Sequence, residues 1–276
     1  MKQFRFGLIG HPISHSLSPA LFRAGYQGRY SYDLIEEEDF DKAYSRFLEE
    51  YDAINVTAPF KEQAWKKADI STDECDIIGA ANILIKTPDG KIMAANSDHS
   101  GVTGAVAKGL IPGIKIHQTA LIAGCGGAAK AAAYAMCTSG YRTVILNRNE
   151  QKAIDFAFRL KKDYGFDIEA HPIGEFRKWF RRSGVIIYTL PLAIPDLESL
   201  SRRDLTGGLF RSESKVIVEA NYKDPAFTME MTERMQKVNP ELRYVDGKEW
   251  LLHQAVGAYM RFTDEAPNIE QMRKVL

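Results

Sequence analysis

The chain has 276 residues, which at roughly 100–200 residues per domain suggests about two domains and a core that needs no disulfides. Hydrophobic residues make up 45% and charged residues 26%, values that are ordinary for a folded protein and exclude a disordered one. The 36 Lys and Arg balance the 36 Asp and Glu, so there is no overall positive field to gather nucleic acid or an acidic membrane surface.

The three cysteines, Cys75, Cys125 and Cys137, show no CxxC spacing. Neither a disulfide framework nor a metal site is therefore predicted, and a reducing cytoplasm is the expected location. The N-terminus lacks the apolar core and cleavage site of a signal peptide. With no window of about 18 uncharged apolar residues, a membrane span is not expected either.

Short β-branched and aromatic runs alternate with helix-period stretches, which predicts βα units around a mainly parallel sheet. In the first part of the chain, strands are expected at 4–9, 30–35 and 53–56, with helices at 19–24 and 39–50. Residues 84–96 differ, because an Asp89-Gly90 turn lies between strand-like flanks. This segment is interpreted as a hairpin that forms an antiparallel edge of the sheet.

A second α/β series follows the helix-like stretch 100–110, which ends at Pro112-Gly113. Its expected strands are 119–123, 143–146, 185–189 and 216–220, and its expected helices are 127–139, 149–163 and 228–238. The helix-like stretch 248–262 and a short helical run ending at Leu276 are expected to return to the first domain. The predicted fold class is α/β with two domains: residues 1–100 with 248–276, and a doubly wound, Rossmann-like domain at 101–247.

A glycine-rich turn follows the first strand of the second series. Gly124, Gly126 and Ala129 fit the pattern G-x-G-x-x-G/A, with Gly127 and Ala128 between them, in the required strand–turn–helix context. Glycines here permit a tight turn and the close approach of backbone N–H groups to a pyrophosphate. A dinucleotide site is predicted; a tight turn packed for structural reasons alone is the alternative.

The next strand ends at Asn147-Arg148, where an NAD-binding protein would present a carboxylate to the ribose. A guanidinium instead bonds the 2′-phosphate of NADP, so NADP is the predicted cofactor. Lys152, one helical turn further, can add a second positive charge on the same side. The alternative is that both cations are ordinary solvated surface charges.

Polar residues follow the strands of the first series. Ser16 and Ser18 stand in an extended loop where both hydroxyls can face a polyol or carboxylate, although Ser18 could instead be the N-cap of the next helix. Lys61, after the strand 53–56, is a candidate acid–base group at the edge where α/β sheets gather ligands. Most lysines simply lie in solvent.

Asn82 and Asp98 stand at further strand ends of the same domain, and the topology is expected to bring them near Lys61. Asp98 could merely cap the following helix. Paired with Lys61, its carboxylate would instead hold the ammonium in place and help to move a proton during hydride transfer.

Taken together, these motifs resemble the shikimate dehydrogenase family, whose members interconvert 3-dehydroshikimate and shikimate with NADP in the chorismate pathway to aromatic amino acids. The resemblance spans nearly the whole chain. Its motifs are GHPISHSLSP at 10–19, NVTAPFK at 55–61, GAAN at 79–82, NSDHSG at 96–101, GCGGAA at 124–129, NRN at 147–149 and HQA at 253–255.

The resemblance implies an NADP-dependent oxidoreductase with Lys61 and Asp98 as the catalytic pair. It implies substrate contacts from Ser16, Ser18, Thr57, Asn82, Tyr222 and Gln254. It also implies that Asp73 and Gly247 border the nicotinamide, in a cleft between the two domains. The expected partners are the small-molecule substrate and, at most, a second copy of the chain, since a monomer and a homodimer are equally compatible with the sequence.

Two alternatives remain open at this stage. A quinate/shikimate dehydrogenase, or a relative acting on an analogue, would keep the Lys61–Asp98 pair. A binding protein without turnover is the second, because residues 188–192 read Tyr-Thr-Leu-Pro-Leu where the family usually has an Asn-Ala-Thr/Ser turn that lines the cofactor.

Overall fold

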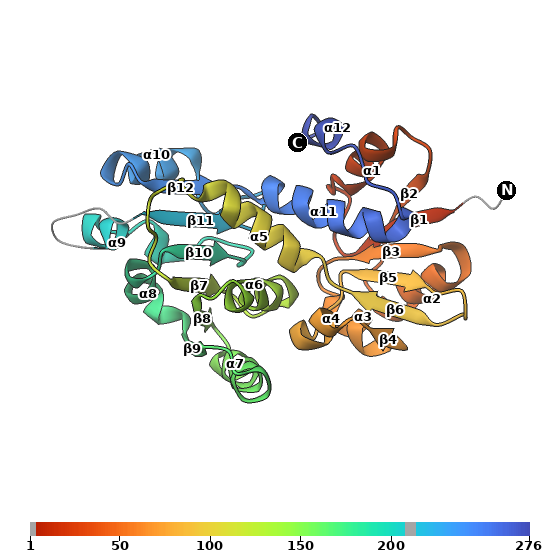
Figure 1. The fold of residues 1–276 in the computed structure, drawn as a ribbon, viewed down its shortest axis with the longest axis horizontal. Coiled ribbons are helices and arrows are strands. Elements are labelled where there is room, and N and C mark those ends of the chain that lie inside the picture. Colours follow the sequence, from red (N-terminus) through yellow and green to blue (C-terminus); the bar gives the residue numbers. More distant parts are fainter. Residues whose placement is uncertain (1–3, 208–213) are drawn as a thin grey trace. The chain divides into compact units, whose positions relative to one another are not determined.

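The computed structural model describes residues 4–207 and 214–276, and the chain divides into two compact units (Figure 1). Unit 1 consists of Met1–Gly101 and Leu251–Leu276, and unit 2 consists of Val102–Trp250. Each unit contains a six-stranded sheet with helices, so the predicted α/β class is confirmed.

The sheet of unit 1 is mixed. In spatial order its strands are β2 (Ser31–Glu36), β1 (Arg5–Gly10), β3 (Ala53–Val56), β5 (Ile83–Lys86), β6 (Ile92–Ala95) and β4 (Ile70–Ser71). Strand β1 pairs in parallel with β2 and β3, whereas β5 is antiparallel to both β3 and β6. The hairpin predicted within 84–96 is therefore confirmed.

The interpretation of that hairpin as the edge of the sheet is wrong. Strand β4 pairs in parallel with β6 and takes the edge position. The pairing satisfies backbone groups of β6, and it continues past β4 in the hydrogen bond from Thr72 N to Ala94 O at 3.1 Å. With only two residues, Ile70 and Ser71, β4 is too short to produce a periodic signal in the sequence.

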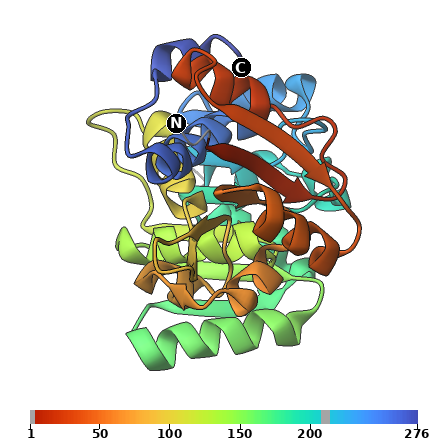
Figure 2. The same ribbon diagram turned by 90° about the vertical axis from the view of Figure 1, so that its right-hand side faces the viewer.

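In unit 1, each of the first four strands of the chain is followed by a helix, and a further helix lies near the C-terminus. They are α1 (Ser18–Tyr26), α2 (Phe40–Glu50), α3 (Lys61–Lys67), α4 (Asp73–Ile78) and α12 (Ile269–Arg273). The suggestion that Ser18 caps α1 is wrong, because the N-cap is Leu17 and Ser18 is already in the first turn. Helix α12 lies beside α1 in both views (Figures 1 and 2), and Asn268 N donates to Gly25 O at 2.8 Å.

Two longer helices include the points where the chain passes from one unit to the other. Helix α5 (Asp98–Gly109) begins in unit 1, and α11 (Gly247–Thr263) begins in unit 2. In unit 1, α11 contributes Tyr259, whose buried ring packs edge-on against Phe22 of α1. The C-terminal part of the chain thus completes the core of the unit that the N-terminal part begins.

The sheet of unit 2 is wholly parallel. Its strands, in spatial order, are β12 (Leu242–Val245), β11 (Lys215–Glu219), β10 (Val185–Tyr188), β7 (Thr119–Ala123), β8 (Arg142–Asn147) and β9 (Ile168–Pro172). The chain runs outward from β7 in one direction and then from β10 in the other. This reversal places a topological switch point at the carboxyl ends of β7 and β10, where doubly wound sheets bind ligands.

Helices of unit 2 connect these parallel strands. They are α6 (Gly127–Thr138), α7 (Glu150–Tyr164), α8 (Phe176–Arg182), α9 (Arg202–Thr206) and α10 (Met229–Val238), with short 3-10 turns at Ile173–Glu175 and Pro195–Leu197. The predicted helices at 127–139, 149–163 and 228–238 are confirmed to within a residue at each end. Buried aromatic rings of Phe176, Phe180, Tyr188 and Phe227 form much of the core around β10 and β11.

Candidate active site

Lys61 and Asp98 form an ion pair inside unit 1. Lys61 is the first residue of α3, just after β3, and Asp98 is the first residue of α5, just after β6. The distance from Lys61 Nζ to Asp98 Oδ2 is 2.6 Å, with 13% of the lysine side chain and 1% of the aspartate side chain exposed. A helix N-terminus favours the carboxylate and disfavours the ammonium, so Asp98 also offsets the unfavourable position of Lys61.

Asn82 is the third member of this cluster. It immediately precedes β5 and is buried, and its Nδ2 group donates to Asp98 Oδ1 at 3.2 Å and to Ser97 Oγ at 3.0 Å. Both oxygens of Asp98 therefore have a donor, one from Lys61 and one from Asn82. The structure brings together three residues that the sequence analysis singled out at three different strand ends.

The loop between β1 and α1 carries the two predicted serines. Ser16 Oγ donates to Ser18 Oγ at 3.2 Å and also accepts the backbone N–H of Ser18 at 3.2 Å. Thr57 follows β3 nearby, since a Cβ atom added to Gly10 would lie 2.4 Å from Thr57 Cγ2. The absence of a side chain at Gly10 thus lets the threonine pack against the start of the serine loop.

Sequence reasoning did not select Asn55, Tyr32 or Tyr259, which hold several of these groups in place. Tyr32 OH donates to Asn55 Oδ1 at 2.8 Å, and Asn55 Nδ2 donates to the backbone oxygen of Asn82 at 3.1 Å. Tyr259 OH donates to Ser18 O at 3.0 Å. Burial raises the pKa of Tyr32 well above its usual value, which keeps the phenol a neutral donor. Of these three residues, Asn55 had a signal in the sequence, because it begins the motif NVTAPFK at 55–61.

Gln254 and Asp73 lie on two helices of unit 1. Gln254 is half-buried on α11, one turn before Gly257 and so on the same face. A Cβ atom at Gly257 would lie only 3.3 Å from Ser97 Cβ, which places this face of α11 against the residue beside Asp98. Asp73 is exposed at the start of α4.

The predicted dinucleotide loop lies at the carboxyl end of β7 in unit 2. Gly124 has a φ of 117°, and an added Cβ atom would lie 2.4 Å from Thr189 Oγ1, so only glycine suits this position. Gly126 is exposed and faces open space, with nothing within 4 Å of an added Cβ atom. Helix α6 begins directly afterwards with Gly127 and Ala128, and Gly126 as its N-cap brings no side-chain acceptor for the first N–H groups.

The next strand end carries Asn147 and Arg148. Asn147 Nδ2 donates to Asn149 O at 2.8 Å, and Asn149 caps α7 by accepting the N–H of Lys152 at 3.2 Å. Arg148 and Lys152 are both exposed. Strands β7 and β8 are parallel neighbours, and Gly124 N donates to Leu146 O at 2.7 Å. The glycine loop and these two cations therefore lie at the carboxyl ends of adjacent strands.

Tyr222 and Gly247 also belong to unit 2. The buried Glu219, at the end of β11, accepts the N–H groups of Ala226 and Phe227 at 2.5 and 3.3 Å and thereby closes the loop that carries Tyr222. A Cβ atom at Gly247 would lie 2.9 Å from Tyr222 N, so this glycine lets the start of α11 approach the same loop. Burial raises the pKa of Glu219.

The unusual segment 188–192 packs against the glycine loop. Thr189 Oγ1 donates to Ala123 O at 2.7 Å, and Tyr188 OH donates to Leu192 O at 2.6 Å, which folds the segment back on itself. Burial raises the pKa of Tyr188 to about 12. The buried tyrosine thus serves the packing of this turn, and Leu192 is left 75% exposed at its tip.

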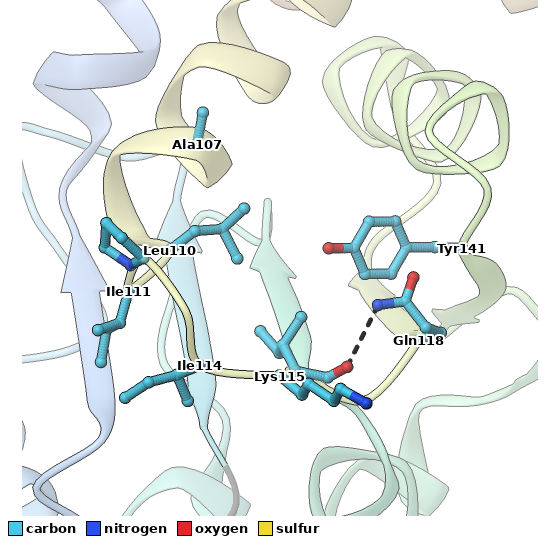
Figure 3. A pocket seen from close by; sticks show the side chains of 9 residues that line it. Ala107, Leu110, Ile111, Ile114, Lys115, Gln118 and Tyr141 are labelled. Carbon is cyan, nitrogen blue, oxygen red and sulfur yellow. Dashed lines mark hydrogen bonds between the residues drawn. The ribbon is translucent and has the colours of Figure 1, made fainter.

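A shallow groove of about 690 Å³ lies elsewhere on unit 2 (Figure 3). Leu110 and Ile114 line it, together with Tyr141 and Gln118, whose side chain donates to Ile116 O at 3.2 Å. Gln118 and Tyr141 come just before β7 and β8. The groove is therefore at the amino ends of these strands, opposite the glycine loop, and it is not the predicted cofactor site.

The residues at the carboxyl ends of β7 and β8 in unit 2 have the chemistry needed to bind a dinucleotide. The open Gly126, the helix N-terminus behind it and the cations Arg148 and Lys152 provide groups for a pyrophosphate and for a further phosphate. Within 4–207 and 214–276, no cluster of three or more His, Cys, Asp or Glu is arranged to hold a metal ion. None of the helices in the same residues has the length and apolar character needed to cross a membrane.

The fold and the site define a two-unit α/β dehydrogenase, with a Rossmann-like nucleotide unit and a second unit that holds a buried lysine–aspartate pair. Residues 8–84 match the family model described as the shikimate dehydrogenase substrate binding domain. The shikimate dehydrogenase (NADP(+)) of Bartonella quintana is 32% identical over 270 residues, covering 95% of this chain and 88% of that protein. The chain belongs to the shikimate dehydrogenase family.

Solved structures give the same result for the fold. The shikimate 5-dehydrogenase of Thermus thermophilus, in complex with NADP(H) and shikimate, aligns with a TM-score of 0.77 at 25% identity, over 99% of this chain and 100% of that one. The quinate dehydrogenase of Corynebacterium glutamicum, in complex with NAD, aligns with a TM-score of 0.80 over 99% and 98% of the two chains. At 20% identity, this second likeness concerns the fold alone.

Proposed function

We propose that the protein is an NADP-dependent shikimate dehydrogenase, which reversibly reduces 3-dehydroshikimate to shikimate. The observation that carries this proposal is the buried Lys61–Asp98 pair, 2.6 Å between Nζ and Oδ2, in the unit whose residues 8–84 match the family's substrate binding domain. Unit 1 binds the substrate, and unit 2 binds the dinucleotide.

Bound NADPH supplies the hydride for the ring ketone carbon of 3-dehydroshikimate. Lys61 Nζ gives a proton to the oxygen as the alkoxide forms, and it takes the proton back in the reverse direction. Asp98 holds the ammonium in position through the 2.6 Å contact and stabilises its positive charge. The hydride on carbon and the proton on oxygen together convert the ketone into the alcohol.

Substrate hydroxyls and the carboxylate are bound by the polar groups around this pair. The proposed substrate contacts are Ser16, Ser18, Thr57, Asn82, Tyr222 and Gln254. A site that hydrogen-bonds each hydroxyl discriminates steeply against analogues lacking one, because the protein group would be left unpaired. In unit 2, Arg148 and Lys152 bind the 2′-phosphate of NADP. The family resemblance further assigns Asp73 and Gly247 to the surroundings of the nicotinamide.

The proposal is tested by following the absorbance of reduced nicotinamide with purified protein, shikimate, and NADP or NAD in parallel. Turnover with NADP that is lost in Lys61→Ala supports both the activity and the role of the lysine. Quinate in place of shikimate tests the alternative substrate. Folded protein without turnover on either substrate contradicts the proposal and favours a binding protein.

A further inference from the structure

Asp98 is held at its backbone as well as at its carboxylate. Its N–H is among the first in α5, which have no partner within the helix. Asn96 Oδ1 accepts this N–H at 2.9 Å, and Asn96 Nδ2 donates to Ala80 O at 2.8 Å. Asn96 is 1% exposed, so this one amide connects the turn before Asn82 to the start of the helix that carries Asp98.

A second amide makes a parallel connection between the same two segments. Asn82 Oδ1 accepts Ser97 N at 2.8 Å, and Asn82 Nδ2 donates to Ser97 Oγ at 3.0 Å. On the other side, Gly257 of α11 leaves just enough room for Ser97. Asn96 and Ser97, the two residues that precede Asp98, are thus held by hydrogen bonds to the segment before β5 and by packing against α11, and their side chains are buried.

We propose that Asn96 is a positioning residue, which sets the direction of the Asp98 carboxylate and, through it, the position of the Lys61 ammonium. The carboxylate has one oxygen bound to Asn82 and the other to Lys61 Nζ, so a rotation or shift of the Asp98 backbone moves the ammonium away from its place. Asn96 reaches the reacting atoms only through Asp98. This inference rests on the proposed function, in which Lys61 transfers the proton.

Removal of the Asn96 amide is expected to change the rate of the chemical step more than substrate binding. A displacement of about 1 Å in a catalytic group can cost about 100-fold in rate. We expect Asn96→Ala to lower kcat about 10- to 100-fold, with a KM for shikimate that stays near the wild-type value, because the substrate-binding hydroxyls and amides are unchanged. Asn96→Ser, whose hydroxyl can still accept the Asp98 N–H, is expected to recover part of kcat.

Asn239 provides a matched control in unit 2. It is fully buried, its Oδ1 accepts Glu241 N at 3.1 Å two residues further on, and its Nδ2 donates to Leu205 O at 2.8 Å. Asn239→Ala therefore removes the same two kinds of hydrogen bond far along the chain from the ion pair. We expect it to lower the melting temperature as Asn96→Ala does, while kcat keeps its wild-type value at temperatures where both variants are folded.

A readout that needs no turnover separates this inference from the proposed function. Lys61 is acetylated with limiting acetic anhydride, and the modified peptide is quantified by mass spectrometry in wild type, Asn96→Ala and Asn239→Ala. Faster labelling of Lys61 in Asn96→Ala alone supports the positioning role, even if shikimate is not turned over. Unchanged labelling together with unchanged kcat overturns it, as does an equal loss of kcat in Asn239→Ala.

Discussion

The buried pair of Lys61 and Asp98 makes stability and catalysis separable by mutation. In Lys61→Met, the carboxylate of Asp98, only 1% exposed, loses its countercharge. At an effective dielectric constant of about 20, two unit charges 2.6 Å apart attract by about 6 kcal/mol, of which desolvation offsets a part. Removing one partner of a buried pair costs about 3–5 kcal/mol, and we expect the free energy of unfolding to fall by that amount.

The double variant Lys61→Met/Asp98→Asn removes both charges and keeps an oxygen that can accept the Asn82 N–H. Because replacing both members of a buried ion pair is often neutral, we expect it to regain at least about 2 kcal/mol of the loss. Turnover is expected to stay about 100- to 10,000-fold below wild type in both variants, since neither has Lys61, the proposed proton donor.

Urea unfolding followed by circular dichroism measures the stabilities, and nicotinamide absorbance measures turnover on the same preparations. Each variant is compared at the same pH and ionic strength. A Lys61→Met protein as stable as wild type would refute the reasoning, because it would mean that the aspartate is not left as an unpaired buried charge. A double variant that regains no stability would refute it as well.

Four further variants test Arg148, the two glycines of the predicted dinucleotide loop and a buried carboxyl group. Arg148→Ala should lower kcat/KM for NADP about 10- to 100-fold and change that for NAD much less, because a charge-assisted hydrogen bond contributes about 1.5–3 kcal/mol; parallel assays with both cofactors check this. Gly124→Ala should lower the melting temperature, because the new Cβ atom would lie 2.4 Å from Thr189 Oγ1. Gly126→Ala should keep the wild-type melting temperature yet weaken NADP binding in a fluorescence titration, and the reverse pattern would contradict the assigned roles. Burial raises the pKa of Glu219, so its contribution to stability is present at low pH and is lost as pH rises through the folded-state pKa. Glu219→Gln does not ionise, and its free energy of unfolding should therefore rise relative to that of wild type as pH increases. Urea unfolding from pH 4 to 8 measures this difference.

Local patterns in the sequence were sufficient to locate most of the framework. Strands 53–56 and 119–123 have the predicted bounds, and helix α6 begins at the predicted Gly127. These elements depend on periodicity, turn residues and glycines, which act over a few neighbouring positions. The same local signals identified Gly124, whose φ of 117° suits only glycine.

The candidate active site depends both on the residue types in the sequence and on contacts that only the tertiary structure makes. The types of residue at the strand ends suggested that Lys61, Asn82 and Asp98 would meet, and the ion pair joins residues 37 positions apart. The roles of Asn96, Asn55 and Tyr32 could not be read in this way. A buried asparagine or tyrosine acquires its function from the atom it reaches, as when Asn96 Nδ2 meets Ala80 O across the β5–β6 hairpin.

The sequence alone determined the class of fold, the position of the dinucleotide loop and the candidate catalytic pair, because backbone conformation and residue chemistry are local properties. The tertiary structure decided that β4 rather than the hairpin forms the edge of the first sheet, and that Leu17 rather than Ser18 caps α1. It also decided which amides orient Asp98. Each of these outcomes depends on strand order, register and close packing between distant segments, which no window of neighbouring residues encodes.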